Sequence, residues 1–320
     1  MSEAIDTQWM SRDPDTIPLN QLDLMNPQLF HDDYHVKVFE RLRQESPVHL
    51  QKDHAEIGSF WNVTRYEDIM AVDTNHDSFS SDGSITAVDQ DEEFPLPMFI
   101  AMDPPKHDQQ RKEVSSAVQP SNLAKMESTI RERVCGILDS LPRGEEFNWV
   151  DRVSIELTTQ MLATLFDFPF EDRRKLTRWS DVATADEDSG IIESEDQRRA
   201  ELFECLEYFT GLWNERVNEP PRGDLISMLA HGESTKNMDP VEYLGNLVLL
   251  IVGGNDTTRN SISGGIKFLN ENPAEYQKLR DNHGLIPNMV PEIIRYQTPL
   301  AYMRRTALKD SVLGGQNIKE

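Results

Sequence analysis

The stretch Leu247-Val-Leu-Leu-Ile-Val-Gly-Gly-Asn-Asp-Thr-Thr258 decides how this sequence is interpreted. It lies in a segment that begins with the helix entry Asp239-Pro240 and meets no further proline until Pro273, which predicts one helix over 240–271. At 1.5 Å per residue this helix is about 48 Å long. A compact chain of this size is roughly 50 Å across. The part before the glycines is apolar all round, which is typical of a helix buried in a large core.

The residues that follow, from Gly253 to Thr258, break the rules for a buried helix. Each glycine costs about 1 kcal/mol relative to alanine inside a helix, and an unpaired buried carboxylate costs more. One interpretation is a helix crossing that needs small residues, with Asp256 and the threonines bonding locally. The other is functional: Gly253 and Gly254 let a flat ligand approach the backbone, and Asp256 and Thr257 deliver protons to it. A locally widened helix is often found at such sites.

Composition excludes several classes of partner. The 320 residues include 32 basic and 56 acidic side chains, a net charge of −24, and such a surface repels nucleic acid and anionic membranes. The apolar fraction of 38% is enough for a buried core. Cys135 and Cys205 cannot form a disulfide framework, and no segment reaches the roughly 18–20 apolar residues of a membrane span. We therefore expect a cytoplasmic protein without a transmembrane anchor.

Most of the remaining chain also has helical periodicity, with a little strand. We find no internal repeat and no linker, so the expected fold class is mainly α with minor β, in a single domain over 1–320. Helices are expected over 34–43, 66–72, 105–118, 121–141, 150–166, 200–217, 274–280 and 287–295, and strands over 48–50, 60–64 and after 300.

Two sets of charged residues stand out in the sequence. Glu292 and Arg295 lie one helical turn apart among apolar residues, which favours a buried ion pair with further partners over an exposed pair of little worth. His107 and Arg111 lie four residues apart at a helix start, and Arg305 lies in the strand-like region. These three cations suit the carboxylates of a large cofactor, although a His/Arg pair alone would more often be surface decoration.

Together these segments resemble the bacterial cytochrome P450 family, the haem-thiolate monooxygenases. The resemblance is carried by Met102-Asp-Pro-Pro-Lys-His107 with Arg111, Gly253-Gly-Asn-Asp-Thr-Thr258, Glu292-Ile-Ile-Arg295 and Arg305-Thr-Ala-Leu-Lys-Asp310. It implies the cytochrome P450 fold, incomplete at the C-terminus. At finer grain, 99–108, 249–260 and 297–305 resemble the group that hydroxylates n-alkanes and fatty acids at the terminal carbon.

The resemblance also implies a role for each site residue. Asp256 and Thr257 match the acid–alcohol pair that protonates dioxygen so that its O–O bond splits, and Glu292 and Arg295 match a structural ion pair on the proximal side of the haem. The remaining implied contacts are listed by role: His107, Arg111 and Arg305 hold the haem propionates, Gly253 and Gly254 face the cofactor, and Phe99, Ile100, Leu249, Leu250, Leu300 and Ala301 contact an apolar substrate.

The implied cofactor is haem b with its iron, and the implied partners are O2, a small apolar substrate and a ferredoxin. Electrons would come from NADH through ferredoxin reductase and ferredoxin, and we expect a monomer. The family's axial cysteine lies in a glycine-rich loop near the C-terminus. Cys135 and Cys205 lie in helical segments and are interpreted as packing residues.

No metal ligand is therefore assigned in this chain, and the axial cysteine is expected beyond residue 320. On that interpretation the chain is a C-terminally truncated fragment, and the fragment itself is expected to be inactive. The rival hypothesis is a non-catalytic remnant that binds a hydrophobic ligand without haem. The proton-delivery pair Asp256 and Thr257 argues against it, since a carrier has no use for such a pair.

Overall fold

The computed structural model describes residues 12–320 except 56, 91–92 and 186–188. The chain divides into two compact units, one made of the residues up to Gln90 with Met303–Glu320, the other of Asp91–Tyr302. Most of the described chain is helical with small sheets, which confirms the expected fold class. Among the described residues, no helix is both long and apolar enough to cross a membrane.

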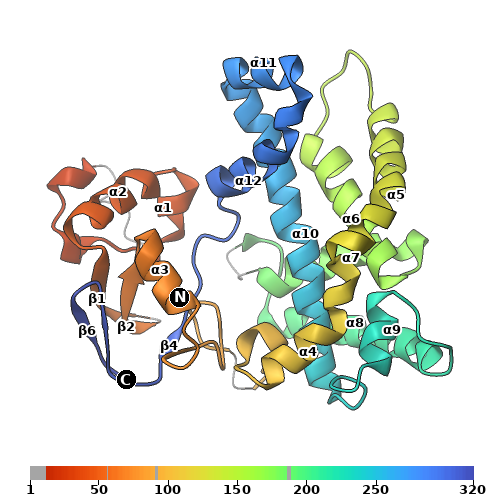
Figure 1. Ribbon diagram of the computed structural model, residues 1–320, viewed down its shortest axis with the longest axis horizontal. Coiled ribbons are helices and arrows are strands. Elements are labelled where there is room, and N and C mark those ends of the chain that lie inside the picture. Colours follow the sequence, from red (N-terminus) through yellow and green to blue (C-terminus); the bar gives the residue numbers. More distant parts are fainter. Residues whose placement is uncertain (1–11, 56, 91–92, 186–188) are drawn as a thin grey trace. The chain divides into compact units, whose positions relative to one another are not determined.

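The first unit combines short helices with three two-stranded antiparallel sheets. The pairs are β1 with β2, β3 with β4, and β5 with β6 (Figure 1). Pairing of β3 with β4 joins residues far apart in the sequence, since Phe79 lies opposite Ala307. The elements are η2 Pro14–Thr16, η3 Leu19–Gln21, α1 Pro27–His31, α2 His35–Glu45, β1 Val48–His54, β2 Gly58–Val63, α3 Tyr66–Asp73, β3 Phe79–Ser80, β4 Thr306–Ala307, β5 Ser311–Leu313 and β6 Gln316–Ile318.

The second unit is helical throughout its described elements. Its elements are η4 Phe99–Ala101, α4 Lys106–Ser115, η5 Ser116–Val118, α5 Pro120–Asp139, η6 Val150–Ile155, α6 Glu156–Phe166, η7 Phe170–Asp172, α7 Arg174–Thr184, α8 Glu195–Arg216, α9 Leu225–His231, α10 Pro240–Glu271, α11 Pro273–Asp281, η9 His283–Leu285 and α12 Ile286–Gln297.

Helix α10 runs through the middle of this unit, alongside α6 and α7 (Figure 1). The side chain of Asp239 accepts a hydrogen bond from the backbone N–H of Val241, 2.9 Å away, and Pro240 occupies the first turn. This N-cap confirms the helix start that the sequence predicts. The helix is α-helical over its whole length. The expectation of a widened turn beside Gly253 and Gly254 is therefore wrong, and a π-helical turn lies instead at η6, before α6.

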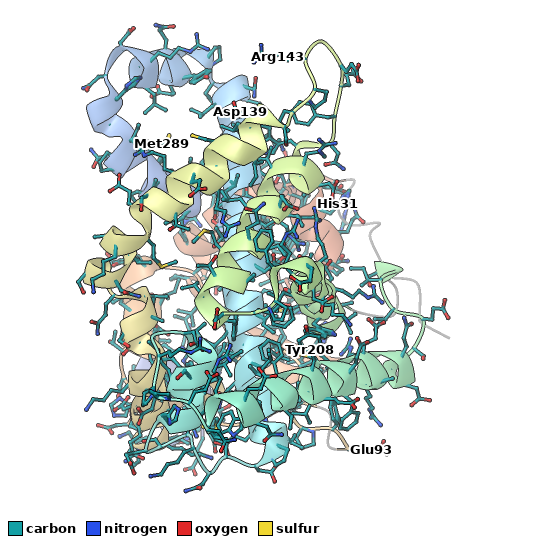
Figure 2. All side chains as sticks on the ribbon, turned by 90° about the vertical axis from the view of Figure 1, so that its right-hand side faces the viewer. His31, Glu93, Asp139, Arg143, Tyr208 and Met289 are labelled. Atoms are coloured by element: carbon teal, nitrogen blue, oxygen red, sulfur yellow. The ribbon has the colours of Figure 1, made fainter. Side chains whose placement is uncertain are left out.

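The core of the second unit lies where α6, α7, α8 and α10 meet. Phe166 and Phe209 are fully buried there, in edge-to-face contact with ring centroids 5.4 Å apart. Tyr208, labelled in Figure 2, stacks on Phe168 and donates a hydrogen bond of 2.7 Å to Asp172. Fully burying aromatic side chains of this size contributes about 1.5–3 kcal/mol each. This core holds α10 in place, and so fixes the residues described next.

Candidate functional site

Gly253 leaves a bare strip of backbone at the centre of α10. The residue is exposed, and a Cβ placed on it would meet nothing within 4 Å. One turn further on, the hydroxyl of Thr257 donates a hydrogen bond to the carbonyl of Gly253, 3.0 Å away. A flat ligand can lie against such a strip, next to the hydroxyl. Gly253 and Thr257 therefore fit the functional interpretation of this stretch.

Gly254 faces another side of the helix and makes a helix crossing. A Cβ on it would lie 2.6 Å from Cδ2 of Leu162, on α6. The neighbouring Asn255 is fully buried, and its side-chain oxygen accepts a hydrogen bond from Thr158 at 2.9 Å. The two interpretations of the glycine pair therefore divide between its members, with Gly253 open and Gly254 packed.

Asp256 is paired, unlike the unpaired buried carboxylate that the sequence suggested. It forms an ion pair with Arg259 on the same helix, and Arg259 also binds Asp181 of α7 at 3.0 Å. Burial would lower the pKa of Arg259, but the hydrogen bonds and charges of the two aspartates outweigh burial and raise this pKa. The Asp256 side chain keeps 30% of its surface exposed. The acid is thus held beside the guanidinium and still reaches solvent.

Four of the six predicted substrate contacts belong to one apolar cluster. Phe99 is buried in the core of the second unit, and Ile100, Leu249 and Leu250 pack against that core while keeping some exposed surface. The other two predicted contacts, Leu300 and Ala301, are exposed, and the structure does not bring them into this cluster.

The predicted propionate cations differ in their surroundings. His107 is half-buried, and its Nδ1 lies 2.8 Å from the carbonyl oxygen of Phe99. Because a carbonyl only accepts, Nδ1 is the donor. Arg111, one turn along α4, is exposed and makes no hydrogen bond or ion pair with any residue in the described part of the chain. It is therefore available to a carboxylate, whereas Arg305, in the first unit, already binds Asp73 at 2.6 Å.

Glu292 and Arg295 form the predicted ion pair, with two hydrogen bonds of 2.7 and 2.8 Å. These bonds lower the pKa of Glu292. The two side chains are 60% and 67% exposed, so the described residues neither bury the pair nor supply the further partners that the sequence favours. No described segment covers this face of α12, where Ile294 and Tyr296 are exposed as well. An ion pair so open to water contributes little stability.

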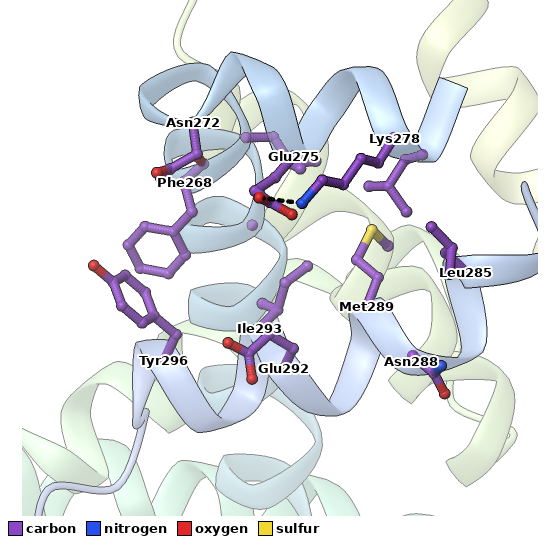
Figure 3. A pocket seen from close by; sticks show the side chains of 13 residues that line it. Phe268, Asn272, Glu275, Lys278, Leu285, Asn288, Met289, Glu292, Ile293 and Tyr296 are labelled. Atoms are coloured by element: carbon purple, nitrogen blue, oxygen red, sulfur yellow. Dashed lines mark hydrogen bonds and ion pairs between the residues drawn. The ribbon is translucent and has the colours of Figure 1, made fainter. Parts of the chain in front are cut away.

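A hollow of about 470 Å³ lies between α10, α11 and α12 (Figure 3). Its walls include Phe268, Met289 and Ile293, and Glu275 binds Lys278 at 2.6 Å on one side. Of the predicted site residues it contains only Glu292. The hollow is therefore separate from the strip at Gly253.

The two cysteines lie in different surroundings. Cys205 is fully buried in α8, and burial raises the pKa of its thiol, which disfavours the thiolate form. Cys135 is exposed on α5. Within the described residues, no group of three or more His, Cys, Asp or Glu side chains could hold a metal ion.

Two buried, hydrogen-bonded amide side chains beside Phe99 were not predicted from the sequence. Asn246 is completely buried in α10, and Gln110, from α4, is almost completely buried. An amide inside the apolar run Leu244–Val252 was a signal for this pair of amides, because buried polar groups need partners.

Comparison with known proteins agrees with this geometry. No protein-family profile matches the chain. It is 32% identical to linalool 8-monooxygenase of Pseudomonas putida, over 92% of this chain and 75% of that protein. It is 29% identical to methyl-branched lipid omega-hydroxylase of Mycobacterium tuberculosis, over 98% of this chain and 77% of that protein.

A solved structure is similar to this chain at a higher sequence identity. Cytochrome P450-153 from Novosphingobium aromaticivorans superimposes with a TM-score of 0.84 at 46% identity, over 91% of this chain and 74% of that one. The chain thus spans about three quarters of the length of the proteins that it matches. The similarity in sequence and in fold shows that the chain belongs to the cytochrome P450 family of monooxygenases.

Proposed function

We propose that this protein is a haem-dependent monooxygenase that inserts one oxygen atom of O2 into the terminal C–H bond of n-alkanes or fatty acids. The observation that carries the proposal is the hydroxyl of Thr257 on the carbonyl of Gly253, at the bare strip of α10. An apolar lining suits an alkyl chain, and the apolar side chains of Phe99, Leu249 and Leu250 lie in one cluster. The likeness to a lipid omega-hydroxylase supports a terminal position of attack.

The residues present fit haem b. The strip at Gly253 offers the flat surface that a macrocycle needs. The imidazole of His107 and the guanidinium of Arg111 suit its carboxylates, and no described residue pairs with Arg111. Arg305, in the first unit, is bound to Asp73. When bound, haem supplies an iron that activates O2. We propose that its electrons come from NADH through ferredoxin reductase and ferredoxin.

The chain's own residues hold and supply protons at this strip. Thr257 keeps its proton on Oγ1, donated to the carbonyl of Gly253, so the lone pairs of Oγ1 remain available to accept another. Asp256 is held by Arg259 and reaches solvent, which suits a group that collects protons from water. We propose that Oγ1 of Thr257 accepts a proton from Asp256 as it gives up the proton that it carries, so that the hydroxyl stays neutral.

We also propose that the thiolate ligand comes from outside residues 1–320. The buried thiol of Cys205 is inert for the reason given above, and the exposed Cys135 lies on α5, an element that carries none of the proposed site residues.

Replacement of Thr257 by alanine tests the proposed function. Thr257→Ala removes the hydroxyl, so NADH should still be consumed while less of it yields hydroxylated fatty acid. We expect the product formed per NADH to fall on the order of tenfold or more, since a positioned proton donor contributes 10²–10⁴-fold. The measurement is NADH consumption and product in the same reaction.

Thr258→Ala is the matched control, because Thr258 is the next residue on the helix and is exposed. It should leave the yield per NADH unchanged. Equal yields from Thr257→Ala and the unmodified protein would refute the role given to Thr257.

A further inference from the structure

The turn η4, Phe99–Ala101, is held by side chains of two different helices. The backbone N–H of Phe99 donates to Oδ1 of Asn246, on α10, at 2.8 Å. The carbonyl of Phe99 accepts from Nδ1 of His107, on α4, at 2.8 Å. Both backbone polar groups of one predicted substrate contact are therefore bound by helices that carry the proposed cofactor site.

A directional chain of hydrogen bonds fixes the orientation of Asn246. It begins at Glu242, whose carboxylate can only accept and which also binds Lys106 at 2.9 Å. The side-chain amide of Gln110 donates to that carboxylate, so the carbonyl of Gln110 points the other way and accepts from Nδ2 of Asn246 at 3.2 Å. Oδ1 of Asn246 is thereby directed at Phe99. Neither amide can flip without setting two acceptors against each other.

Gly245 allows the residues that precede Phe99 to pack directly against α10. A Cβ on Gly245 would lie 2.0 Å from the carbonyl oxygen of Pro97, so only glycine permits this approach. Asn246 is completely buried and Gln110 is 2% exposed. Water therefore cannot replace the hydrogen bond to Phe99, and losing its partner would leave a buried N–H unsatisfied.

We propose that Asn246 is a positioning residue that fixes the turn Phe99–Ala101 against α10 and so determines which carbon of an alkyl chain is oxidised. This inference rests on the proposed function, since Phe99 and Ile100 are the predicted substrate contacts in that turn. With Asn246 in place, the turn Phe99–Ala101 cannot move away from α10, and the alkyl chain of the substrate is held with its terminal carbon at the position of oxidation. Without Asn246, the turn can move away from α10, and carbons before the terminal one become accessible to oxidation.

Amide hydrogen exchange at Phe99 directly tests the clamp, meaning the hydrogen bond from the backbone N–H of Phe99 to Asn246. The measurement requires no enzymatic reaction. Asn246→Leu keeps the side-chain volume and removes the acceptor, so exchange at this amide should rise about tenfold or more. Tyr243→Phe is the matched control, because it removes another buried hydrogen bond of α10, to the carbonyl of Phe209. It should leave exchange at Phe99 unchanged. Unchanged exchange in Asn246→Leu, or an equal rise in both variants, would overturn the clamp.

Gln110→Met covers the case in which Asn246→Leu does not fold. It removes the group that orients Asn246, so exchange at Phe99 should rise severalfold, less than in Asn246→Leu. No rise in Gln110→Met would contradict the directional chain.

Product distribution tests the consequence in the haem-loaded protein. Asn246→Leu should lower the ratio of terminal to internal hydroxylation of a fatty acid severalfold, whereas Tyr243→Phe should preserve it. An unchanged ratio would refute the positioning role even if the clamp exists. If the unmodified protein forms no hydroxylated product, the proposed function fails, while the exchange measurement still decides the clamp.

Discussion

Single glycines of α10 do three different things within one helix. Gly245 admits the backbone of Pro97, Gly254 packs on Leu162, and Gly253 faces open space. Their shared cost to the helix is similar, about 1 kcal/mol each relative to alanine. The role of each glycine depends on the atoms that lie beside it, and these atoms differ among the three positions.

Alanine at two of these positions should change stability in opposite directions. Gly245→Ala would force Cβ to within 2.0 Å of the Pro97 carbonyl oxygen, so we expect the free energy of unfolding to fall by about 2–3 kcal/mol. Gly253→Ala meets no atom within 4 Å and should raise it by about 1 kcal/mol through helix propensity. Denaturant unfolding of the two variants measures both. Similar shifts of the same sign would contradict the packing described for Gly245.

At the scale of elements, Glu156 ties α6 to the start of α7. Its carboxylate binds Arg173 at 2.9 Å and Arg174 at 2.7 Å, and its side chain is 17% exposed. Burial would raise the pKa of Glu156, but the hydrogen bonds from Gln160 and Arg173 and the two guanidinium charges outweigh it and lower this pKa. The ionised form of Glu156 therefore stabilises the pairing of α6 with α7.

Glu156→Gln should change the pH dependence of stability. A carboxyl with a lowered pKa in the folded state stabilises above its ordinary pKa, and this contribution is lost as pH falls through the folded value. We expect the variant to lose about 1–2 kcal/mol at neutral pH. This difference from the unmodified protein should shrink below about pH 4.5.

Urea unfolding across this pH range measures the effect. Glu204→Gln is the control, since Glu204 is 53% exposed in its pair with Lys175 and should matter little. A pH-independent loss in Glu156→Gln would show that the charge of Glu156 is not what joins the two helices.

For the whole molecule, the sequence predicted α10 to the residue because its start and stop signals are strong. Asp239-Pro240 and Pro273 are local features that need no tertiary contact to act. Helix α7 was not predicted as an element, although Leu176, Trp179 and Val182 recur at helical spacing; its buried face also contains Thr177 and Ser180. Sequence periodicity reports apolar side chains, whereas this helix also buries hydroxyls.

The candidate site was predictable where it violates helix rules and unpredictable where it depends on distant partners. Gly253 and Thr257 were found because a glycine and a hydroxyl are unexpected in a buried helix. Asn246 was missed because its partner Phe99 lies 147 residues away in the sequence. The burial of Glu292 could not be derived from its apolar neighbours alone, because burial depends on what covers α12.

The central claim for the whole protein is that the site on α10 places oxygen from O2 on the terminal carbon of an alkyl chain. Variants with Cys135→Ser or Cys205→Ser serve as controls for the ligand proposal. With the thiolate supplied from outside residues 1–320, as proposed above, both should retain activity and the absorption at about 450 nm of the reduced carbon monoxide complex, a property of haem-thiolate iron. Loss of that absorption in either variant would make the substituted cysteine a candidate for the ligand.

The most direct test uses the haem-loaded protein together with the thiolate ligand proposed to come from outside residues 1–320. It is supplied with electrons, a fatty acid or an n-alkane, and isotopically labelled O2, and the label is located by mass spectrometry. We predict one labelled oxygen atom on the terminal carbon, which requires both the monooxygenase chemistry and the end-on position of the chain. Label at internal carbons, or product oxygen that comes from water, would contradict the account.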